Sequence, residues 1–258
     1  LLKSSENKNK ELLDSIKYAK RIQSAIMPSK KQLSQLIPNG FVIYKPKDIV
    51  AGDFYWLNQK GNDLYMAACD CTGHGVPGAL VSVVCNTALN RSIKEFELQT
   101  PGEILDKTRE LVLTEFEKSE DEVNDGMDIA LIRLNGNKLY FSGANNPLWI
   151  VRKNSDLLEA IKGCKQSIGL TNNPTAFLTH EINLSKGDCI YVFTDGYSDQ
   201  FGGPKGKKFK SRAFKELLQS VNKEPINKQK EIIETTMKNW KGKLDQVDDI
   251  CVIGLKVN

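Results

Sequence analysis

The chain has 258 residues, of which 40% are apolar, 8% aromatic and 26% charged, and 19 are glycine. This is the composition of a globular protein, and it excludes a disordered chain because the apolar content is too high for the charge. No stretch of the sequence approaches the roughly 18 uninterrupted apolar residues of a membrane-spanning helix. No fixed-period self-similarity is present, which excludes a repeat array.

The charge balance is mild, with 36 basic against 32 acidic residues and a net charge of +4. Aromatic residues are not interleaved with the basic ones, so no nucleic-acid partner is predicted. The six cysteines need no disulfide framework in a chain of this length, and no signal peptide is visible. We therefore expect reduced thiols and a cytoplasmic protein. The sequence does not begin with methionine, so we expect a fragment whose missing N-terminal part could tether it to a membrane.

Residues 1–28 are predicted to form an amphipathic linker helix. Its apolar positions recur at helical spacing and form one stripe: Leu12, Ile16, Ala19, Ile22 and Ile26. Charged residues occupy the other faces, and Pro28 ends the helix. The stripe fits a helix that docks on its own domain. It also fits a coiled coil that joins two chains into a homodimer and connects them to a missing N-terminal sensor domain.

Residues 29–258 are predicted to form one domain. Short segments rich in β-branched and aromatic residues are predicted to be strands: 41–45, 54–58, 64–70, 129–134, 138–142, 148–152, 177–184, 189–194 and 250–257. Glycine-containing turns at 60–62 and 135–137 predict antiparallel hairpins. Helical periodicity predicts helices over 78–96, 102–117, 211–221 and 228–240. This order of elements predicts an α+β fold with a central antiparallel β-sandwich flanked by α-helices.

Acidic residues recur at the ends of these apolar strands. Asp53 follows Gly52, Asp70 and Asp195 each end an apolar run, and Asp248 with Asp249 precedes another. A single such residue is typical of a turn or a cap, but the repetition predicts that several carboxylates gather in one place. Such a cluster repels itself unless a cation neutralises it. Hard oxygen ligands suit Mg²⁺ or Mn²⁺ better than Zn²⁺.

Several motifs in chain order carry a resemblance to a known family. They are Gly52-Asp53-Phe54-Tyr55, Asp70 followed by Gly73-His74-Gly75 and Pro77-Gly78-Ala79, Phe193-Thr194-Asp195-Gly196, and Asp248-Asp249-Ile250. The set resembles the PPM-type metal-dependent protein serine/threonine phosphatases, in their bacterial SpoIIE/RsbU-like branch. Segments 142–147 and 168–170 resemble further landmarks of that branch, and 15–23 resembles linker helices that join such domains to sensors. The resemblance covers about residues 41–257.

The resemblance implies a site with two Mn²⁺ or Mg²⁺ ions at one edge of the sandwich. The residues implied to hold them are Asp53, Asp70, the carbonyl of Cys71, Asp195, Asp248 and Asp249. Asp53 and Asp70 would lie between the metals, and which of the adjacent pair at 248–249 is the direct ligand stays open. A water activated by the metals would attack the phosphorus in line, so no nucleophilic side chain is required.

Two positions depart from the family pattern. Animal members place an aspartate that helps to bind a third metal where this chain has Ala144, so a third ion is in question, with Asp128 as an alternative ligand. The phosphate-binding arginine of animal members has no clear match. Lys45 or Lys47 could replace it, or both could be solvated lysines, and His74 could line the site or only shape a turn.

Rival interpretations remain. Cys69, Cys71 and His74 invite a zinc site, but no fourth ligand is apparent. The basic stretch 205–212 is either a solvated loop or a flap that attracts a phosphoprotein. The predicted function is hydrolysis of phosphoserine or phosphothreonine on a signalling phosphoprotein, in this branch often an anti-sigma-factor antagonist. The alternatives are a catalytically silent scaffold that binds a regulatory partner and, more weakly, an enzyme for small phosphoesters. The retained carboxylates favour the enzyme.

Overall fold

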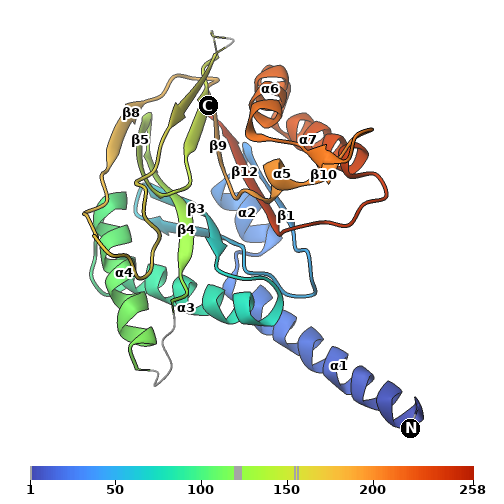
Figure 1. Cartoon of the computed structure of the whole chain (residues 1–258). Coiled ribbons are helices and arrows are strands. Elements are labelled where there is room, and N and C mark those ends of the chain that lie inside the picture. The colour runs from blue at the N-terminus through green and yellow to red at the C-terminus, as the bar shows by residue number, and fades with distance from the viewer. Residues whose placement is uncertain (1, 119–123, 154, 156) are drawn as a thin grey trace.

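Two five-stranded antiparallel sheets lie face to face at the centre of the computed structural model, which describes residues 2–118, 124–153, 155 and 157–258. The first sheet has the order β1 (Gly40–Lys45), β12 (Ile250–Lys256), β9 (Cys189–Phe193), β6 (Leu148–Val151) and β7 (Leu158–Ile161). The second has the order β2 (Phe54–Lys60), β3 (Asp63–Cys71), β4 (Met127–Asn135), β5 (Lys138–Ala144) and β8 (His180–Asn183). Figure 1 shows the two sheets side by side.

The predicted hairpins are present. β2 pairs with β3 and β4 pairs with β5, both antiparallel. Gly61 and Gly136 at the turns each have a φ of 59°, in the left-handed region where glycine is unstrained. The register places Asp70 of β3 directly opposite Asp128 of β4, a pairing that matters for the site below.

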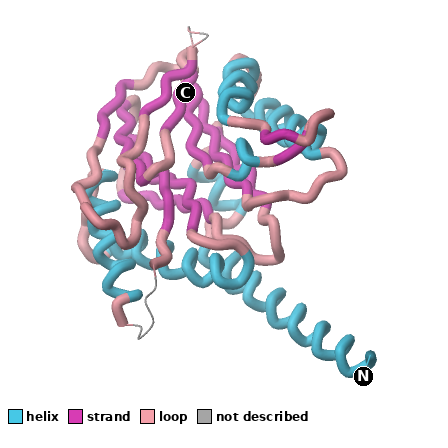
Figure 2. Tube along the Cα trace, in the orientation of Figure 1, coloured by secondary structure: helices cyan, strands magenta, loops and turns pink. Residues whose placement is uncertain are grey.

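Helices cover both outer faces of the sandwich, as Figures 1 and 2 show. α3 (Gly75–Lys94) and α4 (Pro101–Phe116) share an apolar core with the second sheet, and α6 (Ser211–Val221) and α7 (Ile226–Lys241) share another with the first. A third apolar cluster fills the space between the sheets. Strands β9 and β6 are buried on both faces because a layer of helices lies on one side of them and the second sheet lies on the other. The predicted α+β sandwich with flanking helices is therefore confirmed.

Several element bounds differ from the sequence prediction. The strand predicted over 177–184 is limited to β8, because the preceding chain is held against α4, where the Gly102 amide donates to Thr179 Oγ1 at 2.8 Å. α3 begins at Gly75 rather than residue 78, and α7 begins at Ile226 rather than residue 228. Short elements were not predicted: α2 (Lys30–Leu36), α5 (Gly196–Asp199), β7, β10 (Phe201–Gly202) and β11 (Lys207–Lys208). They are too short or too polar to show a periodic pattern.

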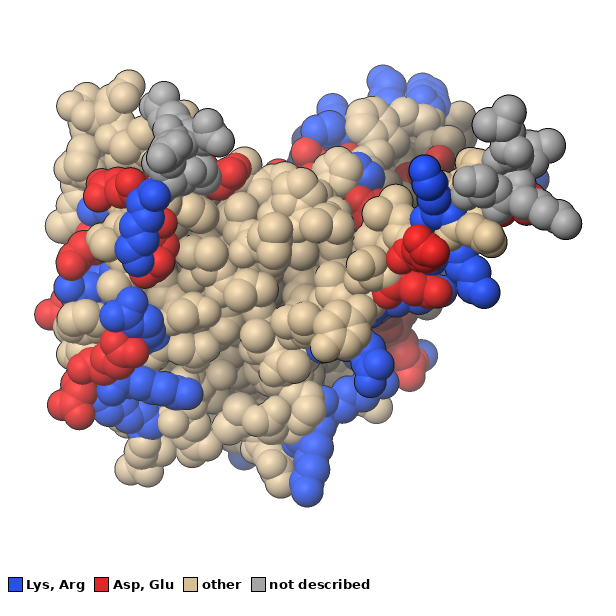
Figure 3. Space-filling view, turned by 90° about the horizontal axis from the view of Figure 1, so that it is seen from below, with Lys and Arg blue, Asp and Glu red and all other residues tan. Residues whose placement is uncertain are grey.

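α1 (Leu2–Ile26) projects from the sandwich and meets it only near its C-terminal end (Figure 1). Its Gln23 is 5% exposed, whereas Leu12, Tyr18 and Ile22 are largely exposed. The face that carries α1 and α3 bears its charged side chains mainly at the margins and is uncharged across its middle (Figure 3). No helix in the described part of the chain is long and apolar enough to cross a bilayer.

Candidate active site

The strand-end aspartates predicted from the sequence come from four elements that meet at one end of the sandwich. Asp53 immediately precedes β2, Asp70 lies near the end of β3, and Asp195 follows β9 by two residues and directly precedes α5. Asp248 precedes β12. A cleft of about 270 Å³ opens there, and its lining includes Asp70, Cys71, Gly73, His74, Asp128, Ser167 and Asp248.

Two glycines allow the loops of the cleft to approach each other. A Cβ atom on Gly52 would lie 2.2 Å from the carbonyl oxygen of Gly73, and one on Gly196 would lie 1.9 Å from that of Asp249. Real Cβ atoms do not come so close to a backbone oxygen, so any side chain at either position would push the loops apart. This explains why the aspartates at 53 and 195 each have a glycine neighbour.

The carboxylates raise each other's pKa values. Burial raises the pKa of Asp53 well above its ordinary value, and the charge of Asp70 adds to this effect. Burial, together with the charges of Asp195, Asp248 and Asp128, raises the pKa of Asp70 to about 8. Burial and the charges of Asp199 and Asp248 raise the pKa of Asp195 to about 6. The aspartates therefore act electrostatically as one cluster.

Neighbouring groups hold two of the aspartates in place. Asp53 is 3% exposed, and its Oδ2 accepts a hydrogen bond of 2.6 Å from the hydroxyl of Thr194. Asp249 is 2% exposed, and its two oxygens accept from the backbone amides of Lys47, Gly52 and Asp53 at 2.7, 2.8 and 3.3 Å. Both oxygens of Asp249 are thus used to tie the loop before β2 to the start of β12, while Asp248 lines the open cleft.

The donor chemistry fits a hard divalent cation. Carboxylates and a strand-end carbonyl are the oxygen ligands that Mg²⁺ and Mn²⁺ prefer. Burial and, second to it, mutual repulsion raise the pKa values of Asp53, Asp70 and Asp195, and a bound cation would relieve that repulsion. Within the described residues, no group of three or more His, Cys, Asp or Glu side chains is already arranged to hold a metal ion.

Asp128 lines the same cleft and is held by two polar side chains, Asn145 from the landmark segment 142–147 and Ser167, which the sequence did not single out. Its Oδ1 accepts hydrogen bonds from Asn145 Nδ2 at 2.9 Å and from Ser167 Oγ at 2.6 Å. Asn145 has a φ of 57°, which its short polar side chain tolerates better than most. Asn145 belongs to the landmark segment 142–147, so its contact with Asp128 places this segment beside the cleft, and Ser167 immediately precedes the landmark segment 168–170.

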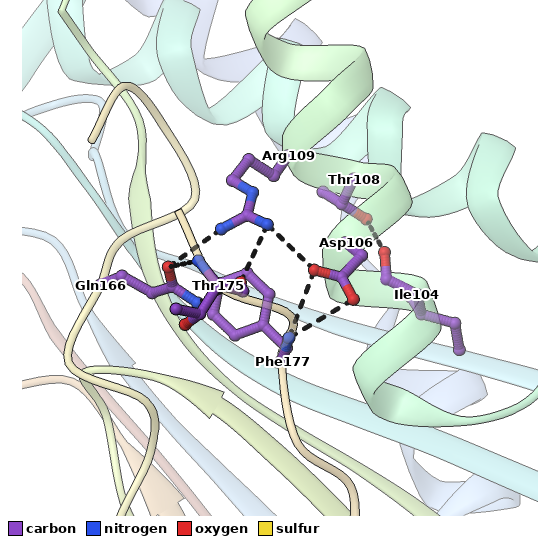
Figure 4. A network of polar contacts seen from close by, with 7 residues as sticks. All are labelled: Ile104, Asp106, Thr108, Arg109, Gln166, Thr175 and Phe177. Atoms are coloured by element: carbon purple, nitrogen blue, oxygen red, sulfur yellow. Dashed lines mark hydrogen bonds and ion pairs between the residues drawn. The ribbon is translucent and has the colours of Figure 1, made fainter. Parts of the chain in front are cut away.

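The loop that carries Ser167 is anchored to α4 by Arg109, as Figure 4 shows. The guanidinium donates at 3.0 Å to Gln166 Oε1, to Asp106 Oδ1 and to the carbonyl of Thr175. It also lies 4.9 Å from the centre of the Phe177 ring. Because a guanidinium offers several donors in a fixed plane, one residue here fixes the loop at several points.

Of the residues considered as phosphate ligands in the sequence, only one lines the cleft within the described residues. Lys45 Nζ lies 3.4 Å from Glu234 and lines another cavity, and Lys47 contributes its backbone amide to Asp249. His74 does line the cleft, and its Nδ1 lies 2.9 Å from Asp48 Oδ2. Lys208, within the basic stretch 205–212, forms an ion pair of 2.7 Å with Asp199, and its charge lowers the pKa of Asp195.

The zinc interpretation finds no support in the geometry. Cys69 and Cys71 are buried in the apolar core under α3, whereas His74 is exposed at the cleft. Burial raises the pKa of both thiols, which disfavours the thiolate that zinc requires. All six cysteines, each within the described residues, are free.

A sandwich of two antiparallel sheets with helices outside and clustered aspartates at one end defines a PPM-type phosphatase domain. The family described as Stage II sporulation protein E (SpoIIE) matches residues 60–258. The chain therefore belongs to the SpoIIE family.

Individual relatives agree with this assignment. The chain is 22% identical over 194 residues to the phosphoserine phosphatase RsbU of Bacillus subtilis (strain 168). The aligned residues cover 73% of this chain and 55% of RsbU. It thus spans about half the length of that relative. The SiaA-PP2C domain of Pseudomonas aeruginosa is similar with a TM-score of 0.86 and 30% identity, covering 97% of this chain and 98% of that domain. The PP2C phosphatase domain of SpoIIE from Bacillus subtilis, solved with a fragment of its regulatory domain, is similar with a TM-score of 0.69 and 16% identity. The similarity covers 85% of this chain and 61% of that structure.

Proposed function

We propose that this chain is a metal-dependent protein phosphatase that hydrolyses phosphoserine or phosphothreonine on a signalling phosphoprotein. The observation that carries the proposal is the cluster of Asp53, Asp70, Asp195 and Asp248 at one end of the sandwich, with the pKa of Asp70 raised to about 8. A chain that only bound a partner would have no electrostatic reason to keep these charges together. The similarity to the phosphoserine phosphatase RsbU supports the substrate class.

Two ions of Mn²⁺ or Mg²⁺ are proposed as cofactors, held by Asp53, Asp70, the Cys71 carbonyl, Asp195 and Asp248. Bound there, they would supply a water that ionises near neutral pH and positive charge for the phosphoryl oxygens. Asp249 is proposed to orient the loops rather than to bind metal, because backbone amides already occupy both of its oxygens. Asp128 is the proposed ligand of any third ion.

The chain's own residues would also position the substrate. Thr194 holds Asp53 in one orientation, so this ligand needs little reorganisation when the cleft is filled. His74, Asn145 and Ser167 offer hydrogen-bonding groups at the rim of the cleft. Lys208 is the proposed source of positive charge for an incoming phosphoprotein, with the hairpin of β10 and β11 as the flap.

The partner and the context are proposed from the family. A phosphorylated domain resembling an anti-sigma-factor antagonist is the proposed substrate. Residues 1–28 are proposed as a linker that pairs two chains and connects them to an N-terminal sensor domain, and 29–258 as the phosphatase domain. Leu12 and Ile22 of the stripe are exposed, whereas Ile16, Ala19 and Ile26 are partly covered. The exposed part supports pairing, because exposed apolar side chains on a helix gain stability from a second helix. A cytoplasmic location is proposed for the domain.

The direct test is release of phosphate from a phosphoserine protein with Mn²⁺, with chelator, and after Mn²⁺ is restored. Turnover is expected only with metal, and Asp195→Asn is expected to abolish it. Asp14→Asn on the exposed part of α1 is the matched control and should keep the parent rate. Undiminished turnover after exhaustive metal removal would overturn the mechanism. No turnover at all, with retained binding of the phosphoprotein, would favour the silent scaffold.

A further inference from the structure

A groove distinct from the acidic cleft follows the outer edge of β1. This strand is at the edge of the first sheet, and among the described strands it pairs only with β12. The wider part of the groove has a volume of about 710 Å³, bordered by α7 on one side and by α2 and Tyr55 on the other. A second cavity of about 260 Å³ shares Glu234 with it and continues past the end of β1 at Lys45. Neither cavity shares a lining residue with the acidic cleft.

The backbone of β1 faces this groove with unpaired groups. The amide of Lys256 donates to the carbonyl of Asn39 at 2.9 Å, so residues 39 and 256 form a hydrogen-bonded pair of the antiparallel ladder. Because such pairs alternate along a ladder, the N–H and C=O groups of Val42 and Tyr44 point away from β12. Within the described part of the chain these groups have no hydrogen-bond partner. An open strand edge of this kind is a template for one more strand.

The two walls of the groove differ in chemistry. The wall formed by α2 and β2 presents Leu33, Ile37 and Tyr55, with Lys30 at the start of α2. The α7 wall carries most of the lysines, at 230, 238 and 241, among the apolar residues at 226 and 237 and the single carboxylate at 234. Side chains of an added strand alternate between the two faces of its sheet. One set would therefore meet an apolar wall and the other a basic wall.

The charge of the groove selects the partner. Its lining contains five lysines, Lys30, Lys45, Lys230, Lys238 and Lys241, and one carboxylate, Glu234, which lies 3.4 Å from Lys45 Nζ. This excess of positive charge favours an acidic ligand. A second copy of this chain would bring the same lysines to the contact and would be repelled.

We propose that the groove binds an extended acidic segment of a partner protein, which adds as an antiparallel strand to β1 with its apolar side chains toward α2 and its acidic side chains toward α7. Main-chain hydrogen bonds to Val42 and Tyr44 provide affinity, and the two walls provide specificity, as in other strand-addition interfaces. The bound segment lies beside Tyr44, whose hydroxyl donates to the carbonyl of Asp53 at 2.9 Å. The surface is thus adjacent to the candidate metal site without being part of it.

The test uses the full chain and three labelled, end-blocked peptides. The first alternates valine and glutamate over eight residues, the second replaces glutamate by lysine, and the third is the first with N-methylated valines. Fluorescence anisotropy measures affinity, and amide chemical shifts locate binding. The valine–glutamate peptide is expected to bind and to shift the amides of Val42 and Tyr44. The other two are expected to bind at least about tenfold more weakly, because they lack the charge or the strand hydrogen bonds.

Variants of the chain separate the groove from general charge. The double variant Lys230→Glu, Lys238→Glu is expected to bind the first peptide at least about tenfold more weakly than the parent. Its melting temperature should be unchanged because both side chains reach solvent. Lys228→Glu, on the same helix but outside the groove, should leave its affinity within twofold of the parent. The proposal would be overturned if the lysine peptide or the N-methylated peptide bound as tightly as the first peptide. It would also be overturned if the amide shifts were confined to the acidic cleft, or if Lys228→Glu lowered the affinity for the first peptide as much as the double variant does. None of these readouts depends on phosphatase activity, so this proposal and the proposed function can fail separately.

Discussion

The side chain of Gln23 makes two hydrogen bonds to the backbone of Ala51. Its Nε2 donates to the Ala51 carbonyl at 2.5 Å, and its Oε1 accepts from the Ala51 amide at 3.1 Å. Nε2 also lies 3.0 Å from the hydroxyl of Ser82 on α3. Since Ala51 is two residues from Asp53, the end of α1 is coupled to a candidate metal ligand through a short backbone segment.

Gln23→Ala is expected to lower the initial rate about 2- to 30-fold, the range that corresponds to a coupling free energy of 0.5–2 kcal/mol. Within the described part of the chain, the Ala51 loop would lose the hydrogen bonds that tie it to the side chain of α1. The measurement is phosphate release at saturating Mn²⁺, with a melting curve to show that the fold persists. Lys20→Ala, exposed on the same helix, is the control. Equal rates for both variants would show that α1 is a passive tether.

The exposed stripe of α1 leads to a second prediction. Ile16→Asp combined with Ile22→Asp is expected to halve the mass of the protein measured by sedimentation velocity and to change its rate, because charges at the stripe prevent helix pairing. Ile22 is 52% exposed, and Ile16 is partly covered but not part of the buried core, so the double substitution leaves the core of the domain in place. Lys20→Asp adds a similar charge on the polar face and should change neither quantity. An unchanged mass and rate over a wide range of concentration would contradict pairing.

Local signals in the sequence were sufficient to predict the sandwich. The hairpins followed from Gly61 and Gly136, and the clustering of the aspartates followed from their recurrence at strand ends, since both depend on neighbouring residues. β10 and β11 were not predictable, because two-residue strands have no periodicity. β7 was missed because its four residues, two of them solvent-exposed, show no alternating apolar pattern.

Contacts between distant parts of the chain explain what the sequence left open. The amides that bind Asp249 lie about two hundred positions away from it, so its orienting role depends on how β12 meets the loop before β2. Lys45 was a reasonable phosphate ligand by position, but the register of β1 directs it to Glu234. Lys208 was within a stretch already noted as a flap, yet only the turn of the hairpin brings it to Asp199.

Removing one carboxylate of the cluster should separate activity from stability. Asp70→Asn and Asp195→Asn are each expected to reduce turnover more than about a hundredfold, because even residues that only orient metal ligands contribute about 10- to 100-fold. Without metal, both variants should melt at a higher temperature than the parent, since one repelling charge is gone. Phosphate release and melting curves in chelator test both statements. Turnover close to the parent in both variants would mean that the ligands are misassigned.

The raised pKa of Asp70 predicts how the metal-free protein responds to pH. Its carboxyl has a pKa of about 8 in the folded chain, against an ordinary value of 3.8. The folded state therefore binds the proton more tightly, and the stability that this provides is complete below about pH 4 and is lost as the pH rises toward 8. Melting temperatures in chelator should fall between pH 5 and pH 8.5. The fall should be smaller in metal-free Asp70→Asn than in the metal-free parent, and smaller again in the parent with saturating Mn²⁺. An equal slope in these three samples would contradict the assignment of the pH dependence to Asp70.

Lys208 is expected to support both the metal site and the substrate. Its ammonium pairs with Asp199 at 2.7 Å, and its charge opposes the burial that raises the pKa of Asp195 to about 6. Replacing Lys208 by methionine removes that charge, so the pKa of Asp195 should rise further, and less of this carboxylate is ionised near pH 6. The half-saturating Mn²⁺ concentration should then increase about two- to fivefold at pH 6 and less at pH 8, a size expected for a partly exposed charge pair.

The control for Lys208→Met is Lys205→Met. Lys205 belongs to the same hairpin and is exposed, and it forms no ion pair within the described residues. Lys205→Met therefore lowers the net charge by as much as Lys208→Met does but leaves the neighbourhood of Asp199 unchanged. The KM for the phosphoprotein should rise more in Lys208→Met than in Lys205→Met, and the difference should shrink at high salt because exposed charges are screened. If the two variants show the same metal dependence at pH 6 and pH 8, the effect is one of net charge, and Lys208 has no particular role beside Asp195.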